Sequence, residues 1–536
     1  MKQHAEPLDK TVAAGQLKKM LRDGGEIALL DVREAGQFGT SHLLFGVPLP
    51  YSRLELDVGR LVPRSSTRIV LCDDGASGVA ALAARRLAHF GYTDCAVLEG
   101  GTRGWAAAGY GLFAGVNVPS KTFGELVEHA YHTPRITAAE LARMQAAGED
   151  MVIVDGRPYA EFRRMNIPGG VCCPNAELPL RIGEIAPRPE TKIIVNCAGR
   201  TRSIIGAQTL INFGVRNPVY ALENGTQGWV LAGLELERGS ARRYPDGIDE
   251  KRLPGLRKSA RTLAERFDVE YVRAALVRQW LRDPERTTYV CDVRTPEEFT
   301  KGSLPGAVHA PGGQLVQATD QWIGVRGAPI VLVDSEEVRA PAVASWLRQL
   351  GFDAYVLKDG IRSSLSVPRA PVPSLPVLAP VTAQELASAT AEWRVFDLRP
   401  SMNFRRSHIP GSRWSTRVRL AADALHQETS IALVAEDVDL ARLAAVDLVE
   451  AGVKNVKLLE GGLDAWTAAG YATEASPGVP PDAECIDYLF FVHDRHAGNH
   501  EAMRQYLDWE TGLTAQLDEQ DRASFRITAG LSAAPH

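Results

Sequence analysis

Long hydrophobic runs and a large excess of charge of one sign are both missing from this 536-residue sequence. No apolar stretch approaches the roughly 18 residues that would indicate a membrane span, so we expect no membrane partner. The net charge is −5, and a protein so nearly neutral offers no general field for nucleic acid. Residues 1–7 lack the apolar core of a signal peptide, so we expect a protein that is not exported.

Cysteine is also scarce, with seven residues and no CxxC spacing. An odd number without regular spacing excludes a ladder of disulfides and the common zinc-binding patterns. The cysteine usage suits a reducing cytosol and one reactive thiol. We therefore expect a cytoplasmic protein that holds neither a metal nor another cofactor.

One pattern occurs four times along the chain, and this repetition decides the architecture. Each copy has an apolar strand that ends in an Asp-x-Arg triplet, then an aromatic residue, a turn, a second strand and a helix that stops at a glycine. The triplets begin at Asp31, Asp155, Asp292 and Asp397, and three copies close on a tryptophan, at Trp105, Trp229 and Trp466. We interpret the triplets as structural ion pairs and the tryptophans as core residues. Strands that alternate with helices predict an α/β fold of four tandem domains, each with a mainly parallel sheet flanked by helices.

The expected domain boundaries follow the repeats and the shifts in composition. They are residues 7–118, 132–240, 264–368 and 380–475, followed by a helical tail over residues 476–536. Residues 119–134, 237–262 and the proline-rich stretch 368–380 are expected to be linkers, the last one stiff and extended. We expect the tail to pack its apolar residues on the fourth domain, namely Tyr488, Leu489, Phe490 and Phe491. The alternative of a metal site on one helical face of the tail, formed by His493, His496 and His500, is less favoured.

Residues 193–203, with the sequence IIVNCAGRTRS, are the most informative stretch of the chain. A strand ends at Cys197, and a short loop that contains Gly199 leads into a helical pattern. An α/β protein places a nucleophile at such a point, because loop N–H groups and the helix N-terminus favour a thiolate and an anionic substrate. Arg200 and Arg202 add two guanidinium groups with the geometry to bind sulfonate or phosphate oxygens.

Taken together, these features resemble the rhodanese (sulfurtransferase) family, over nearly the whole chain to about residue 475. The resemblance rests on the fixed order of the Asp-x-Arg strand end, the Ile/Leu-Pro-Gly turn, the cysteine loop and the Glu-Gly-Gly…Trp closure. It implies tandem rhodanese-like domains of which only the second is catalytic. Asp73, Asp334 and Ala435 stand where that second copy has Cys197. We interpret the other three copies as scaffold or docking modules, and Cys72 as a packed strand residue.

The resemblance also implies a chemistry. A small sulfur-containing anion such as thiosulfate, a mercaptan or a persulfide would donate sulfur to Cys197, and a thiol or cyanide would accept it from the Cys197 persulfide. A protein sulfur acceptor or a second copy of the chain are the macromolecular partners that we consider. The expected substrate-binding residues are Ala198, Gly199, Arg200, Thr201, Arg202 and Ser203, with Glu177 and Arg181 at the mouth of the site.

Several alternatives remain at this stage. Glu161 stands where the familiar two-domain rhodaneses carry an arginine, which weakens the case for thiosulfate as the donor. A phosphatase of the same fold needs one more residue between cysteine and arginine than the spacing from Cys197 to Arg202 allows. A persulfide carrier or scaffold that delivers sulfur to a protein partner is a further alternative. The pair Cys172 and Cys173 is expected to be buried, with a sulfur relay as the lesser reading.

Overall fold

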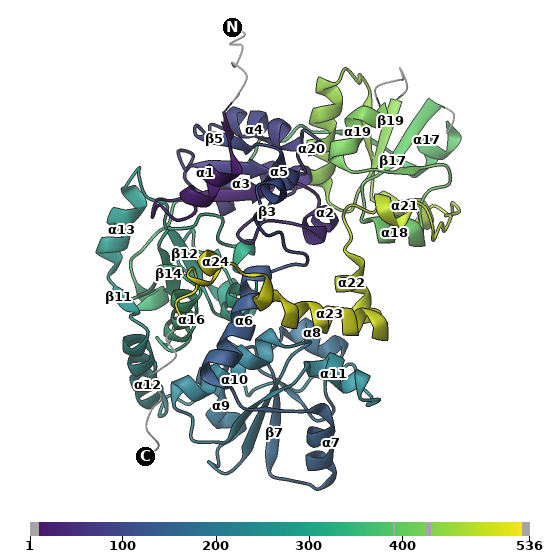
Figure 1. The fold of residues 1–536 in the computed structure, drawn as a ribbon. Helices are drawn as coiled ribbons and strands as arrows, with labels where there is room; N and C mark the ends of the chain where they lie inside the picture. Colours follow the sequence, from purple (N-terminus) through teal and green to yellow (C-terminus); the bar gives the residue numbers. More distant parts are fainter. Residues whose placement is uncertain (1–9, 390–391, 425–429, 528–536) are drawn as a thin grey trace.

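The computed structural model describes residues 10–389, 392–424 and 430–527. They form four units that we call domains 1 to 4, each built on a sheet of five parallel strands with helices around it (Figure 1). The sheets share one topology, in which the first strand of a unit lies at one edge and the third strand at the other. The central strands are buried on both faces, as expected when helices cover both sides of a parallel sheet. The predicted tandem α/β architecture is therefore confirmed.

Domain 1 has the strand order β1-β5-β4-β2-β3. Its strands are β1 (Thr11–Val12), β2 (Ala28–Asp31), β3 (Val47–Pro48), β4 (Ile69–Cys72) and β5 (Cys95–Leu98). Its helices are α1 (Ala14–Met20), α2 (Ala35–Thr40), α3 (Leu54–Leu61), α4 (Val79–His89) and α5 (Gly101–Ala107).

Domain 2 repeats this order as β6-β10-β9-β7-β8. Its strands are β6 (Arg135–Ile136), β7 (Met151–Asp155), β8 (Val171–Cys172), β9 (Lys192–Asn196) and β10 (Val219–Leu222). Its helices are α7 (Ala138–Ala146), α8 (Tyr159–Arg164), α9 (Leu178–Ile185), α10 (Thr201–Phe213) and α11 (Gly225–Leu231).

Domains 3 and 4 repeat the order again. The strands of domain 3 are β11 (Glu270–Val272), β12 (Tyr289–Asp292), β13 (Val308–His309), β14 (Ile330–Val333) and β15 (Ala354–Leu357), and its helices are α13 (Ala274–Arg282), α14 (Pro296–Lys301), α15 (Gly312–Gln317) and α16 (Arg339–Gln349). The strands of domain 4 are β16 (Ala379–Val381), β17 (Trp393–Asp397), β18 (Arg413–Trp414), β19 (Ser430–Val434) and β20 (Val456–Leu459), and its helices are α17 (Ala383–Ser388), α18 (Ser401–Arg406), α19 (Arg417–Ala424), α20 (Val438–Glu450) and α21 (Gly462–Ala468). Within the described residues, no helix has the length and apolar character needed to cross a bilayer.

Each Asp-x-Arg triplet forms a buried ion pair at the end of its strand, as predicted. In domain 2 the Arg157 guanidinium donates to both carboxylate oxygens of Asp155, at 2.8 and 2.7 Å, and to the Met165 carbonyl at 2.6 Å. The same contacts recur in the other three domains. The pair therefore ties the strand end to the turn that follows it. The three tryptophans are also buried, each with 4 or 5% of its surface exposed.

Two segments that we expected to be linkers contain helices instead. Residues 118–131 form α6 (Val118–Tyr131), and residues 253–266 form α12 (Leu253–Arg266). Both helices have proline in the first turn, where its missing N–H costs nothing, so a proline that suggested a linker marks a helix start. Phe123 and Val127 of α6 are fully buried, which makes this helix part of the core between domains.

We expected the tail to pack on the fourth domain, but it also contacts other domains. It contains α22 (Phe490–His493), α23 (His500–Gly512) and α24 (Glu519–Arg522), and it runs in yellow from domain 4 across domains 1 and 2 toward domain 3 (Figure 1). Leu489 lies against Gly39 of domain 1, and the Tyr488 backbone lies against Gly36. Gly36 leaves room for the tail backbone and Gly39 for the Leu489 side chain, so the tail can follow domain 1 closely.

Candidate active site

Cys197 lies directly after β9 and before α10, and only 2% of its surface is exposed. The start of α11 supports its loop from behind, because Thr226 N–H donates to the Cys197 carbonyl at 2.8 Å. The Gln227 side chain donates to the Ala198 carbonyl at 3.0 Å. A Cβ atom at Gly225 would lie 2.3 Å from the Cys197 carbonyl oxygen, so this close approach requires glycine. The nucleophile predicted from the sequence thus stands on a braced strand-to-helix turn.

The backbone of the loop supplies N–H groups, but not all those that we expected. Thr201 N–H donates to Glu510, and the N–H groups of Ser203 and Ile204 donate to the Arg200 carbonyl. None of the hydrogen bonds within the described residues uses the N–H groups of Ala198, Gly199, Arg200 or Arg202. Three of these N–H groups lie in the loop and one in the first turn of α10. These four donors are the ones that could hold an anion.

Arg200, a predicted substrate-binding residue, is bound by two carboxylates of α6. Its guanidinium donates to Glu125 of α6 at 2.7 and 2.8 Å and to Glu128 at 2.5 Å. Burial alone would lower the pKa of Arg200, but the two carboxylates raise it above its ordinary value. Only 6% of the residue is exposed, and its charge is already balanced. The ion pairs of Arg200 therefore hold the loop against α6. Because its charge is neutralised, Arg200 attracts a sulfonate only weakly.

Arg202 is the second guanidinium of the loop, and it too is paired with a carboxylate. Burial alone would lower the pKa of Arg202, but the charges of Glu161 and Cys197 raise it. Two N–H groups of Arg202 bind the Glu161 carboxylate, each at 2.9 Å, and one also reaches Gln314 of domain 3 at 3.4 Å. The guanidinium of Arg202 is thus paired with a carboxylate, and its attraction for an anionic donor is reduced.

The remaining predicted side chains hold the structure together. Thr201 Oγ1 donates to Glu510 at 2.6 Å, and Ser203 Oγ donates to the Arg200 carbonyl at 2.8 Å. Glu177 and Arg181, predicted at the mouth, are both held in contacts with other residues. The Glu177 carboxylate accepts a bond from Arg339 of domain 3 at 2.9 Å, and Arg181 packs over the Tyr244 ring and donates to the Gly247 carbonyl.

The other cysteines of interest are buried and hard to ionise. Burial raises the pKa of Cys172 to about 12 and that of Cys173 well above its ordinary value. Burial raises the pKa of Cys72 in the same way, with Asp31 adding to the shift. Thiols of this kind are weak nucleophiles at neutral pH, so a relay through Cys172 or Cys173 has no support from their surroundings.

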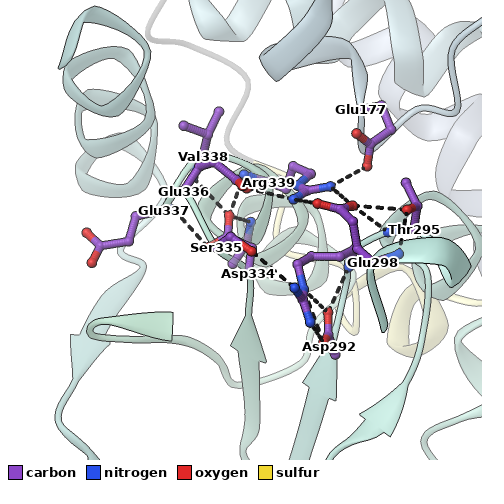
Figure 2. A network of polar contacts seen from close by, with 12 residues as sticks. Glu177, Asp292, Thr295, Glu298, Asp334, Ser335, Glu336, Glu337, Val338 and Arg339 are labelled. Atoms are coloured by element: carbon purple, nitrogen blue, oxygen red, sulfur yellow. Dashed lines mark hydrogen bonds and ion pairs between the residues drawn. The ribbon is translucent and has the colours of Figure 1, made fainter. Parts of the chain in front are cut away.

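In domain 3 the equivalent loop already contains its own anion. Asp334 takes the place of Cys197, and its carboxylate accepts the N–H groups of Glu337, Val338, Arg339 and Ala340 at 2.8 to 3.0 Å (Figure 2). Asp73 does the same in domain 1, where it accepts the N–H groups of Gly75 and Ala80. These loops lack a thiol, and their donors are occupied by an internal carboxylate.

Domains 2 and 3 repeat one further arrangement around their loops. Arg339 follows Asp334 by five positions, as Arg202 follows Cys197, and it binds Glu298, which corresponds to Glu161.

A cavity of ≈ 360 Å³ lies between the two domains, with walls that include Pro158, Tyr159, Glu177, Thr295 and Gln314. Gln314 connects this cavity to Arg202, because it contacts both.

Comparison with known proteins identifies the class to which this fold and site belong. The rhodanese-like domain family matches residues 13–108, 137–232, 274–365 and 382–469, which together are more than half of the chain. The chain therefore belongs to the rhodanese-like family, with four tandem domains, as we predicted.

Two individual proteins are also similar to this chain. The crystal structure of a thiosulfate sulfurtransferase from Pseudomonas aeruginosa is 43% identical, with a TM-score of 0.88 over 97% of this chain and 99% of that chain. The HTH-type transcriptional regulator Rv0324 of Mycobacterium tuberculosis is 34% identical over 105 residues, or 20% of this chain. That match spans 45% of the regulator, so the chain covers less than half of the length of this curated relative.

Proposed function

We propose that the protein is a sulfurtransferase that moves a sulfane sulfur from thiosulfate or a related donor to a thiol or cyanide acceptor. The observation that carries the proposal is the thiol of Cys197 at a braced strand end, beside Arg202 and unused loop N–H groups. The similarity over nearly the whole chain to a protein described as a thiosulfate sulfurtransferase supports the same activity.

The proposed reaction has two displacements. The Cys197 thiolate attacks the outer sulfur of thiosulfate, the sulfur–sulfur bond of the donor breaks, and sulfite leaves with the bonding pair. The acceptor then attacks the outer sulfur of the Cys197 persulfide, and the thiolate of Cys197 leaves with its electron pair. Loop N–H groups would stabilise the charge that moves between these sulfur atoms, as preorganised donors do in other enzymes. No cofactor is needed for either step.

The decisive experiment is mass spectrometry of the intact protein after exposure to thiosulfate, mercaptopyruvate and glutathione persulfide in turn. We expect one donor to add the mass of a single sulfur atom to the peptide that contains Cys197. A protein to which none of these donors adds sulfur is not the sulfurtransferase that we describe.

A persulfide carrier is the second candidate, because three of the four loops lack a thiol and two are filled by a carboxylate. Such a carrier would acquire one sulfur but would not turn over. Thiocyanate formation from thiosulfate and cyanide over many cycles therefore separates the enzyme from the carrier. A phosphatase is disfavoured by the short spacing from Cys197 to Arg202, and hydrolysis of a phosphate ester would revive it.

Glu161 is expected to limit the use of thiosulfate. Replacing Glu161 with Gln removes the negative charge that neutralises Arg202 but keeps an oxygen that can accept its hydrogen bond. We expect kcat/KM for thiosulfate to rise about tenfold, which is about 1.4 kcal/mol, because a dianion then meets one more uncompensated positive charge. Initial rates at several thiosulfate concentrations measure this change.

The matched control is Glu149→Gln, which removes a carboxylate from an exposed ion pair with Lys192 in the same domain. Its kcat/KM is expected to equal that of the wild type. The gain of Glu161→Gln should also shrink as salt is added, because mobile ions screen exposed charges. If Glu161→Gln leaves thiosulfate turnover unchanged at low salt, the carboxylate does not control donor choice.

A further inference from the structure

The C-terminal tail makes direct contact with the Cys197 loop. Glu510, in the last turn of α23, is 0% exposed. Its Oε1 accepts the Thr201 N–H at 3.3 Å and the Thr201 hydroxyl at 2.6 Å. Thr201 is the first residue of α10, so a residue 309 positions further along the chain is joined to the start of that helix.

The second oxygen of Glu510 faces the loop itself. Glu510 Oε2 is buried and has no hydrogen-bond partner within the described residues. It lies 3.0 Å from the point where a Cβ atom on Gly199 would stand, and Tyr506 Cε1 lies 3.3 Å from the same point. Helix α23 also contacts α6 and α11, and it lies across domain 2 in Figure 1. The tail therefore covers the side of the loop that Gly199 leaves open.

Glu510 carries its charge in this buried position. Burial alone would raise the pKa of Glu510, but Lys121 and the hydrogen bonds from Thr201 hold it below its ordinary value. The Lys121 ammonium group, on α6, donates to Glu510 Oε1 at 3.0 Å. A buried carboxylate oxygen without a partner costs free energy, so its place beside the loop requires a firm anchorage of the tail.

The anchorage comes from the other three domains. Asp487 accepts the Ser401 N–H of domain 4 at 2.8 Å, and Trp509 donates to the Ala114 carbonyl, near the end of domain 1, at 2.7 Å. Beyond α23, Asp521 binds Lys18 of domain 1 at 2.8 Å, and Arg526 N–H donates to the Gln349 carbonyl of domain 3 at 2.7 Å. Contacts on both sides of Glu510 thus fix its position over domain 2.

We propose that the tail is a part of the domain 2 site and that Glu510 is a positioning residue, which holds the Cys197 loop through Thr201. The inference rests on the proposed function of Cys197 in sulfur transfer. It also gives a function to the three domains that lack a cysteine at the position of Cys197, because together they hold the tail against the loop of domain 2.

The first test compares Glu510→Ala and Glu510→Gln with the wild type. Loss of the Thr201 contacts lets the loop shift, and misplacement of a nucleophile by about 1 Å lowers a rate by about 100-fold. We expect kcat for thiosulfate to fall between about 10- and 100-fold in Glu510→Ala, with a smaller change in KM. Glu510→Gln keeps an oxygen that can accept the Thr201 bonds, so it should restore part of the loss. The control is Glu501→Gln, an exposed carboxylate in the first turn of the same helix.

A second readout does not depend on sulfur transfer. Cys197 is alkylated with neutral iodoacetamide and with anionic iodoacetate, and the ratio of the two rates reports the charge around the loop. We expect the iodoacetate-to-iodoacetamide ratio to rise in both Glu510 variants, because a negative charge beside Gly199 is gone, and to stay constant in Glu501→Gln. If the wild type forms no persulfide, the proposed function fails, and this ratio still tests the role of Glu510.

Thr201→Val tests the same contact from the domain side and leaves the tail sequence intact. It removes the 2.6 Å bond to Glu510 but keeps the volume of the side chain. If Glu510 acts through Thr201, the double variant should lose no more activity than the larger single loss. Losses that add, or Glu510 variants with wild-type kcat and alkylation ratio, would overturn the inference. If Glu510→Ala does not fold, kcat and the alkylation ratio of Thr201→Val and Glu510→Gln still test whether Glu510 acts through Thr201.

Discussion

Replacing Cys197 with serine is expected to abolish the persulfide and to lower sulfur transfer by about four orders of magnitude or more. A serine hydroxyl is far less acidic than a thiol, and an oxygen–sulfur bond to the transferred atom would not serve as a carrier. The side chain keeps its size, and it remains at the end of β9 where the loop is braced from α11. Thiocyanate formation from thiosulfate and cyanide measures the loss.

Cys72→Ser is the matched control for this variant. Cys72 ends β4 in domain 1 as a buried strand residue, and its high pKa makes it a poor nucleophile. We expect Cys72→Ser to retain wild-type turnover and to acquire one sulfur on Cys197. Retained transfer in Cys197→Ser, or a loss of equal size in Cys72→Ser, would place the reacting thiol somewhere other than the loop of domain 2.

The repeats and the place of Cys197 between a strand and a helix could be predicted because their signals are local. The Asp-x-Arg triplet places a carboxylate and a guanidinium two positions apart, so its ion pair closes within one turn of chain in every domain. The strand, cysteine and helix of domain 2 are also consecutive, and the carboxyl end of a strand is where an α/β fold exposes such a group. Nothing outside these short segments is needed to predict them.

The partners of Arg200 could not be predicted in this way. Glu125 precedes Arg200 by 75 positions, in a segment whose proline and polar residues suggested a linker. The helix that carries Glu125 is stabilised by burial of its apolar residues between domains. The local sequence pattern of that helix does not show which other domains it packs against. The sequence therefore showed a free cation where the fold has a neutralised one.

Glu510 illustrates the same limit at a longer range. It occurs in a tail that resembles no part of the repeats, and no local motif relates it to Cys197. The tail reaches domain 2 only because its other contacts on domains 1, 3 and 4 lie at suitable distances along the chain. Geometry of this kind is a property of the assembled domains.

The loops of domains 1 and 3, which lack the equivalent of Cys197, could be predicted in part. The sequence placed Asp73 and Asp334 at the position that Cys197 takes in domain 2. In the structure, the carboxylates accept N–H groups of the loop, so these groups are already occupied and are not free to bind an anionic donor. A bound carboxylate satisfies donors that would otherwise be buried without a partner. These two loops can therefore be well packed without a cysteine at the position of Cys197.

Arg339→Met is expected to destabilise the arrangement of domains 2 and 3 by about 3 to 5 kcal/mol. The Arg339 guanidinium is 0% exposed and binds three carboxylates, from Glu177 of domain 2 and from Glu298 and Glu336 of domain 3 (Figure 2). A methionine of similar length fills the space but leaves these buried charges unpaired, which costs more than the ion pairs contribute. Chemical denaturation followed by circular dichroism measures the shift of the unfolding midpoint.

Arg348→Met on the same helix is the control for this prediction. Arg348 forms a partly exposed pair with Asp353, and loss of such a pair costs about 0 to 1 kcal/mol. The two arginines therefore differ in burial and in the number of carboxylates that they neutralise, but not in the helix that they occupy. If Arg339→Met unfolds at the same denaturant concentration as Arg348→Met, the carboxylates around Arg339 find other partners or protons. The contact between domains 2 and 3 would then not depend on this guanidinium.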